Sequence, residues 1–108
     1  MHEHEQFVEW AKNVLQRRVG ECKVDQLVKN DDGLSISETT YAYKAAVVMR
    51  AHRIESIPVR SADGRIVGSI TRTSLGDIVG IMDASPYLGE EMMAMILPQA
   101  RELERALP

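Results

Sequence analysis

The sequence predicts a protein of the α/β (α+β) class, with a small three-stranded sheet and helices on one of its faces. A short alternating run at 34–37 precedes a helix-spaced segment that extends to about His52. Two further apolar runs, 57–59 and 65–71, are separated by a turn that ends in Asp-Gly, which is typical of a hairpin. A second helical pattern follows. The predicted order is therefore strand, helix, hairpin, helix.

The first helix of the predicted strand–helix–hairpin–helix order directly follows the strand at 34–37. Thr39 and Thr40 are expected to cap it, because hydroxyl side chains at this position bond free backbone N–H groups. We expect His52 on its inward side. Its small residues, which would let it lie close to a sheet, are Ala42, Ala45 and Ala46.

The hairpin carries two residues with backbone constraints. Pro58 has no N–H to donate, so it is expected at the beginning of a strand or on an unpaired edge. Gly64 can take the positive φ that a tight turn demands. Thr71 or Thr73 can cap the closing helix, whose apolar residues are Leu75, Ile78, Val79 and Met82.

We expect one domain, 1–108, with amphipathic helices at both ends of a central unit, 23–82. The N-terminal helix occupies 1–22, with Gly20 closing it. The C-terminal helical segment occupies 83–108 and begins at Ser85-Pro86, with a kink or break at Pro98. Between them, the sequence predicts a turn or two of helix at Val24–Val28 and a loop at 29–33.

Composition narrows the class of function. The formal net charge of -3 provides no basic field for a phosphate backbone, so nucleic acid is not an expected partner. No apolar run approaches a membrane span and no signal peptide begins the chain, so we expect no membrane association and a cytoplasmic location. Cys22 is the single cysteine, which fits a reducing compartment. No metal is expected, because His2 and His4 lack a third ligand nearby.

The segment from Val24 to Val79 resembles a single CBS domain, the unit named after cystathionine β-synthase. The runs that carry the resemblance are, in order, VDQLV, LSISETTYAYKAAVVM, HRIESIPV and DGRIVGSITRTSL. The resemblance implies a β-α-β-β-α unit that is half of a pseudo-symmetric pair, with clefts that commonly hold adenosine-containing ligands. Because one unit is present, it also implies that a second copy completes a homodimer, and it is compatible with a higher oligomer.

The resemblance also implies a nucleotide-binding site. In nucleotide-binding relatives a Thr or Ser at the end of the hairpin is followed three residues later by an Asp that takes the ribose hydroxyls. Thr71 and Ser74 occupy these positions here, so ribose binding should be weaker without the carboxylate. The alternative is that both residues are helix caps only. Asp77, one turn on, would replace the missing Asp only if the helix were rotated.

The adenine would lie between the first strand and the proline-containing strand, whose residues would also suit an ordinary core. The positions implied are Leu34, Ser35, Ile36, Ile57, Pro58 and Val59. Phosphate-binding relatives tend to place His or Arg before the proline strand, where this chain has Glu55 and Ser56, and a carboxylate there would repel phosphates. Arg72 is the best remaining phosphate ligand, and its alternative is a solvated surface arginine.

Two functions follow as expectations. The first is a regulatory, signal-transducing module that binds an adenine nucleotide or S-adenosylmethionine in the cleft of a homodimer and acts on an unknown protein target. The second is a dimerisation scaffold with a vestigial cleft, which Ser74 and Glu55 favour. An enzyme is not expected, because no constellation of acid, base, nucleophile or metal ligands is evident. A Cys22–His52 nucleophile pair has no support from spacing.

Overall fold

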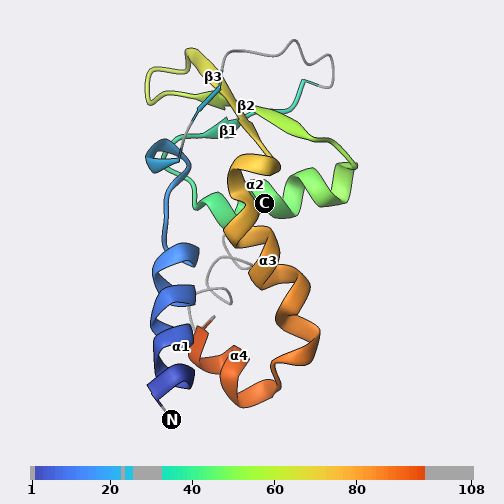
Figure 1. Ribbon diagram of the computed structural model, residues 1–108. Coiled ribbons are helices and arrows are strands. Elements are labelled where there is room, and N and C mark those ends of the chain that lie inside the picture. The colour runs from blue at the N-terminus through green and yellow to red at the C-terminus, as the bar shows by residue number, and fades with distance from the viewer. Residues whose placement is uncertain (1, 23, 26–32, 97–108) are drawn as a thin grey trace.

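The computed structural model describes residues 2–22, 24–25 and 33–96. The molecule is elongated, with extents of 45 × 26 × 23 Å. Its sheet lies at one end and helices α1 (His2–Leu15) and α4 (Glu90–Ile96) lie at the other, as Figure 1 shows. Helices α2 (Ala42–His52) and α3 (Gly76–Ala84) lie between the two ends. This arrangement confirms the α/β class.

The sheet has three strands, β1 (Ile36–Ser37), β2 (Ser56–Arg60) and β3 (Ile66–Thr71), in spatial order β1-β2-β3. Strand β2 pairs with β1 in parallel and with β3 antiparallel. The parallel pair is joined through α2, as a parallel connection requires a crossover, and the antiparallel pair is the predicted hairpin. The mixed three-stranded sheet is therefore as the sequence predicts.

Helices α2 and α3 pack on one face of this sheet. The β-strand residues Ile57, Val59 and Ile70 are at most 1% exposed and belong to the core cluster. The helix residues that share this cluster are Ala42, Ala45, Ala46, Met49, Leu75 and Ile78. The prediction that the alanines bring the first helix close to the sheet is confirmed by their burial.

The start of α2 differs from the prediction. Its N-cap residue is Tyr41, which makes no side-chain cap bond, and neither Thr39 nor Thr40 caps the helix. The N–H of Ala42 instead donates to the carbonyl oxygen of Arg17 at 2.8 Å. A helix begins with free N–H groups, and here a distant segment of backbone satisfies one of them. Local hydroxyl spacing could not reveal that partner.

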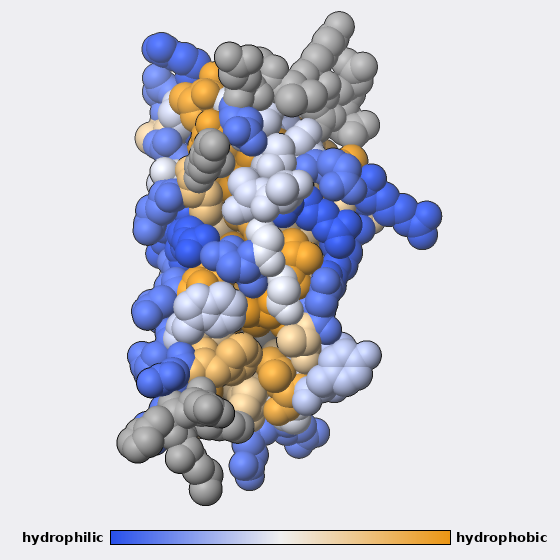
Figure 2. Space-filling view, in the orientation of Figure 1, coloured by the Kyte–Doolittle hydropathy of each residue, from blue (hydrophilic) through white to orange (hydrophobic). Residues whose placement is uncertain are grey.

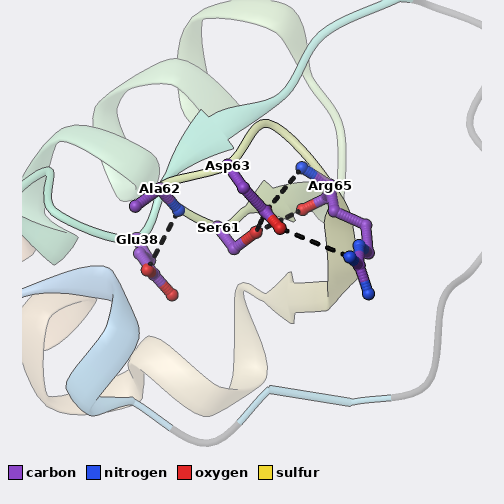
Figure 3. Close-up of polar contacts among 5 residues, drawn as sticks. All are labelled: Glu38, Ser61, Ala62, Asp63 and Arg65. Atoms are coloured by element: carbon purple, nitrogen blue, oxygen red, sulfur yellow. Dashed lines mark hydrogen bonds and ion pairs between the residues drawn. The ribbon is translucent and has the colours of Figure 1, made fainter.

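The hairpin turn between β2 and β3 forms as predicted. Gly64 has a φ of +85°, and its N–H donates to the carbonyl oxygen of Ser61 at 2.9 Å. The Ser61 hydroxyl contacts the Asp63 carboxylate, and the backbone N–H of Arg65 donates to that carboxylate at 3.2 Å (Figure 3). The Glu38 carboxylate accepts a bond from the N–H of Ala62 at 3.2 Å, which ties the turn to the end of β1.

Pro58 lies in the central strand, not on an edge. It is opposite Ser69 of β3, whose N–H and C=O both bond to Asp25 on the outer side of β3. Pro58 and Ser69 thus form a non-hydrogen-bonded pair. Pairing with β1 begins only at Val59, so no ladder bond requires an N–H at position 58. Proline is tolerated in this central strand because no neighbouring carbonyl depends on an N–H at position 58.

Residues Val24 and Asp25 lie along the outer edge of β3. Asp25 forms a bridge with Ser69, so this pair is extended where the sequence suggested helix, and the remainder of the predicted helical turn at 26–28 lies outside the described residues, as do 29–32 of the predicted loop. A Cβ on Gly68 would lie 2.5 Å from the Asp25 carbonyl oxygen, closer than any side chain tolerates. Glycine at 68 therefore permits this close approach.

The terminal helices pack against each other, and α1 also packs against α3. Helix α1 contacts both α3 and α4, and it buries Val8, Ala11, Val14 and Leu15 in the common core. Figure 2 shows apolar side chains between α1 and α3 and over α4, bordered by hydrophilic ones. Helix α1 ends at Leu15, earlier than Gly20, and a 3₁₀ turn at Val19–Glu21 follows.

The predicted helix start at Ser85-Pro86 is wrong. Ser85–Tyr87 is a single 3₁₀ turn, and α4 begins after Gly89, which has a φ of +81°. Ser85 continues directly from α3, and its hydroxyl donates back to the Met82 carbonyl oxygen at 2.7 Å, so it closes the preceding helix. The kink or break predicted at Pro98 lies outside the described residues.

Candidate functional site

Thr71 and Ser74 form a reciprocal cap at the turn that follows β3. The Ser74 N–H donates to the Thr71 hydroxyl and the Thr71 N–H donates to the Ser74 hydroxyl, both at 3.2 Å. The Ser74 hydroxyl also donates to the Thr71 carbonyl oxygen at 2.7 Å. Both residues are half-buried. Both hydroxyls therefore already have protein partners, although each oxygen retains a lone pair for a further donor.

Arg72, between these two residues in the chain, lies beside Glu55. Its N–H donates to the Glu55 carbonyl oxygen at 2.9 Å, and its guanidinium lies 4.0 Å from the Glu55 carboxylate. Arg72 is 48% exposed and Glu55 is 80% exposed, so water screens this ion pair and both groups can reorient. The structure thus places the expected phosphate ligand next to the carboxylate expected to repel phosphate.

The first strand and the proline-containing strand lie side by side, as the predicted site requires. Ile36 is directly opposite Val59, and Ser56 is directly opposite Thr71. The side chain of Ser35 accepts a hydrogen bond from the Arg60 guanidinium at 2.7 Å. The segments around β1, β2 and the end of β3 are therefore parts of one continuous sheet.

Burial divides the predicted site residues into two groups. The side chains of Ile57 and Val59 are at most 1% exposed and pack against the helices, while Ile36 and Pro58 are also buried. In this arrangement these four positions offer a ligand little side-chain surface. Arg72 is exposed, and the predicted positions that are only partly buried are Leu34, Ser35, Thr71 and Ser74.

The two faces of the sheet differ in character. Directly opposed residues share a face, so Ile36, Val59 and Gly68 lie on the helix-covered side, together with the opposed pair Ile57 and Ile70. The other side carries the pairs Ser37 with Arg60, Pro58 with Ser69, and Ser56 with Thr71, and Arg60 is also opposite the exposed Ile66 across a β-bulge. The partly exposed residues of these pairs are Ser37, Ser56, Arg60 and Thr71, whereas Pro58 and Ser69 are buried.

Asp77 is engaged elsewhere and does not face the Thr71–Ser74 turn as a free carboxylate. One oxygen accepts a bond from the N–H of Ile78 at 2.8 Å, and the other accepts from the Arg17 guanidinium at 2.9 Å. The two paired residues are separated by 60 positions. No local motif predicted this contact, because it depends on how the N-terminal segment folds against α3.

A concave region lies beside the 3₁₀ turn at Val19–Glu21. It is an open depression of about 650 Å³ lined by Arg18, Gly20, Glu21, Glu38 and Thr39. The Arg18 guanidinium stacks 3.6 Å from the Tyr41 ring centre and donates to the Thr39 carbonyl oxygen. These contacts are exposed and satisfied within the chain, so the depression shows no group aimed at a ligand.

The remaining reactive side chains show no catalytic arrangement among the described residues. Burial raises the pKa of the Cys22 thiol, although the nearby Arg17 acts in the opposite direction. The neutral thiol is a poor nucleophile. His52 is exposed, so its predicted inward position on α2 is wrong.

Within the described part of the chain, no three His, Cys, Asp or Glu side chains cluster as metal ligands. No helix there is long and apolar enough to cross a membrane.

The fold and the candidate site together define a small β-α-β-β-α module that carries both helices on one face of a mixed sheet. The family model that describes the CBS domain matches residues 24–82, more than half of the chain. This chain belongs to the CBS domain family. A search of curated proteins found no match.

Solved structures that are similar to this chain include the following two. One is the cystathionine beta-synthase pair domain of a putative Mg2+ transporter from Shewanella oneidensis MR-1, with 20% identity and a TM-score of 0.43 over 50% of this chain. The other is CBSX2 in complex with AMP, with 23% identity and a TM-score of 0.40 over 48% of this chain. This chain covers 32% and 35% of the two structures, respectively.

Proposed function

We propose that this CBS domain is a regulatory, ligand-sensing module. It binds an adenosine-containing compound, either an adenine nucleotide or S-adenosylmethionine, in the cleft of a homodimer. The observation that carries the proposal is the convergence of the three segments that the family resemblance assigns to the ligand. The residues around β1, the residues of β2, and the Thr71–Ser74 turn all belong to one short sheet, with Ser56 opposite Thr71.

The chemistry of the partly exposed residues on the sheet's second face supports a polar ligand. Ser37, Ser56 and Thr71 contribute hydroxyl groups, and Arg60 contributes a cation whose guanidinium bonds Ser35. Hydroxyls and a guanidinium can both donate to ribose, adenine or phosphate oxygens and nitrogens. A face built only for hydrophobic association would not need these groups.

A second copy of the chain completes the cleft in this proposal. The family match covers a single unit at residues 24–82, whereas CBS domains commonly pair. Two identical units that pair about a twofold axis use the same surface twice. Cleft residues from both copies would then face the ligand, and Arg72 of each would be free to exchange Glu55 for a phosphate.

We infer that the module acts by binding and not by catalysis. The raised pKa of Cys22 keeps its thiol protonated and therefore poorly nucleophilic. His52 is exposed on α2, and no hydrogen bond joins it to Cys22 among those of the described residues. The signal would pass to an unidentified target protein through the terminal helices.

A scaffold without a ligand is the second candidate, and one observation favours it. The hydroxyls of Thr71 and Ser74 are engaged in their reciprocal cap, and Arg72 is beside Glu55. A cleft whose polar groups already have partners within the chain gains less from a ligand, because fewer of its donors and acceptors remain free to bind it.

The deciding experiment is a thermal melt of the purified, ligand-free protein against AMP, ADP, ATP, S-adenosylmethionine, NAD and cyclic di-AMP. A ligand at 100 times its Kd stabilises the folded state by about 2.7 kcal/mol, which raises the Tm of a small domain by several degrees. Sedimentation gives the oligomeric state in parallel. A shift with one compound supports the sensor, and a flat panel from an intact dimer supports the scaffold.

The variant Thr71→Val locates the binding site, and Thr73→Val is its matched control. Both changes remove a hydroxyl at similar volume, but Thr73 is exposed and makes no bond in the cap. Ligand affinity should fall in the first variant and remain unchanged in the second, with the dimer intact in both. Equal affinity in both variants would remove Thr71 from the site.

A further inference from the structure

Arg17 joins the first turns of the two helices that cover the sheet. Its carbonyl oxygen accepts a bond from the N–H of Ala42, the first residue of α2, at 2.8 Å. Its guanidinium donates to the carboxylate of Asp77, in the first turn of α3, at 2.9 Å. A single residue outside the helices therefore contacts both helix starts.

The Arg17–Asp77 ion pair is better fixed than an ordinary surface pair. The side chains of Arg17 and Asp77 are 32% and 31% exposed, so solvent screens their attraction less than it screens a fully exposed pair. The second carboxylate oxygen of Asp77 bonds the N–H of Ile78, which holds the side chain against its own helix. A movement of the first turn of α3 would thus displace Arg17 directly.

The candidate ligand site is continuous with that turn. Ser74 belongs to the 3₁₀ turn Thr73–Leu75, and α3 begins at the next residue, Gly76. Leu75 is fully buried and anchors this segment in the core. The cap that holds Ser74 and the carboxylate of Asp77 are separated by less than one turn of helix. Only Leu75 and Gly76 separate the Thr71–Ser74 cap from Asp77 in the chain.

On the other side, Arg17 is attached to the end of α1. Its N–H donates to the carbonyl oxygen of Val14 at 3.3 Å, and Gln16 donates to Lys12 at 3.1 Å, so the helical bonding continues up to Arg17. Helix α1 in turn packs against α4. The Thr71–Ser74 turn is thus connected to α1 through Asp77 and Arg17, and to α4 through the packing of α1 against it.

We propose that the Arg17–Asp77 ion pair transmits a displacement of the Thr71–Ser74 turn to α1, which makes the terminal helices the output of the site. The transmission is a property of the fold. Its use as a response to a ligand rests on the proposed function.

The test uses the full chain without any ligand, so that it stands or fails separately from the ligand panel. The variant Ser74→Ala disturbs the cap, and two readouts follow α1. The first is amide hydrogen exchange of residues 7–15, measured relative to the core amides of α2. The second is the fluorescence of Trp10, the single tryptophan, which lies on α1 and is 46% exposed.

The expected result is that Ser74→Ala accelerates exchange in α1 by roughly three- to tenfold beyond the change in α2, with a shift in Trp10 emission. In the Asp77→Asn background the same change at Ser74 should leave α1 unaffected. Asparagine keeps an oxygen for the Ile78 N–H, so it removes chiefly the ion pair. Arg17→Leu, made from the other side of the pair, should give the same loss of transmission.

Asp83→Asn is the matched control. It breaks another α3 ion pair, in which Arg50 of α2 lies 2.5 Å from the Asp83 carboxylate and α1 takes no part. Transmission from Ser74 should survive in this variant. The proposal is overturned if α1 does not respond to Ser74→Ala, or if it responds equally in the Asp77→Asn and wild-type backgrounds.

Discussion

Thr71 and Ser74 each donate a backbone N–H to the other's side-chain hydroxyl, at 3.2 Å in both directions. This reciprocal arrangement has the pattern of a capping box, with a serine in place of the usual glutamate or glutamine. It joins the last residue of β3 to the 3₁₀ turn that begins α3. The residues that the family resemblance assigns to ribose thus also hold the local fold.

The first prediction concerns this structural role. Ser74→Ala removes one acceptor for the Thr71 N–H and the donor to its carbonyl oxygen, so we expect a loss of about 1 kcal/mol in the free energy of unfolding. Denaturant unfolding measures the change. Thr73→Ala, at an exposed neighbouring hydroxyl, should stay within about 0.5 kcal/mol of wild type. Similar losses in both variants would contradict the capping role.

The second prediction concerns ligand binding at the same position. Ser74→Asp introduces the carboxylate that nucleotide-binding relatives carry three residues after Thr71. Aspartate can still accept the Thr71 N–H, and it forms stronger, charge-assisted bonds with ribose hydroxyls. We expect AMP affinity to rise by about tenfold, which corresponds to roughly 1.4 kcal/mol, measured by calorimetry. Thr73→Asp, at the exposed neighbouring position that makes no bond in the cap, is the control for added charge. An equal gain there would argue against ribose recognition at position 74.

Most of the fold could be predicted from the sequence, because its signals are local. The alternation around β1, the Asp-Gly turn and the i, i+3, i+4 spacing in α3 depend only on residues close in the chain. The failures occur where a distant partner satisfies a local need. Ala42 is capped by the Arg17 carbonyl, and Pro58 is accommodated because Ser69 bonds to Asp25 on its other side.

The site was predictable only as a set of positions. The family pattern indicates Thr71 and Ser74, and the place of Arg72 at a helix start indicates a phosphate ligand, but neither carries information on the partners of these residues. The pairing of Arg72 with Glu55 and of Asp77 with Arg17 arises from the packing of segments far apart in sequence. Burial of Ile57 and Val59 likewise depends on which face the helices cover, and a short apolar run gives no indication of that.

The third prediction tests the close approach at Gly68. A Cβ at this position would meet both the Asp25 carbonyl oxygen and the side chain of Val24, so Gly68→Ala should destabilise the fold by about 1–3 kcal/mol. Gly80→Ala is the matched control, because no atom lies within 4 Å of its Cβ position in the middle of α3. That change should stabilise the protein by up to about 1 kcal/mol. Unchanged stability in Gly68→Ala would mean that the Asp25 segment does not pair with β3.

The fourth prediction concerns the protonation of Asp63 in the hairpin turn. A hydrogen bond from the Ser61 hydroxyl, followed by one from the Arg65 N–H, lowers the pKa of Asp63 below its ordinary value. A lowered pKa in the folded state means that this carboxylate contributes stability at pH values above its unfolded pKa, about 3.9. That contribution is lost as the pH falls through the folded pKa.

Carbon-detected NMR titration of the Asp63 carboxyl group measures this shift directly. In Ser61→Ala the largest cause is removed while the turn bond from Gly64 to the residue 61 carbonyl remains, so the pKa of Asp63 should move back toward its ordinary value. Ser56→Ala, on the same strand, should leave the Asp63 titration where it is in wild type. An unchanged Asp63 pKa in Ser61→Ala would show that the hydroxyl contact does not hold the turn in solution, and that the Arg65 N–H alone orders the carboxylate.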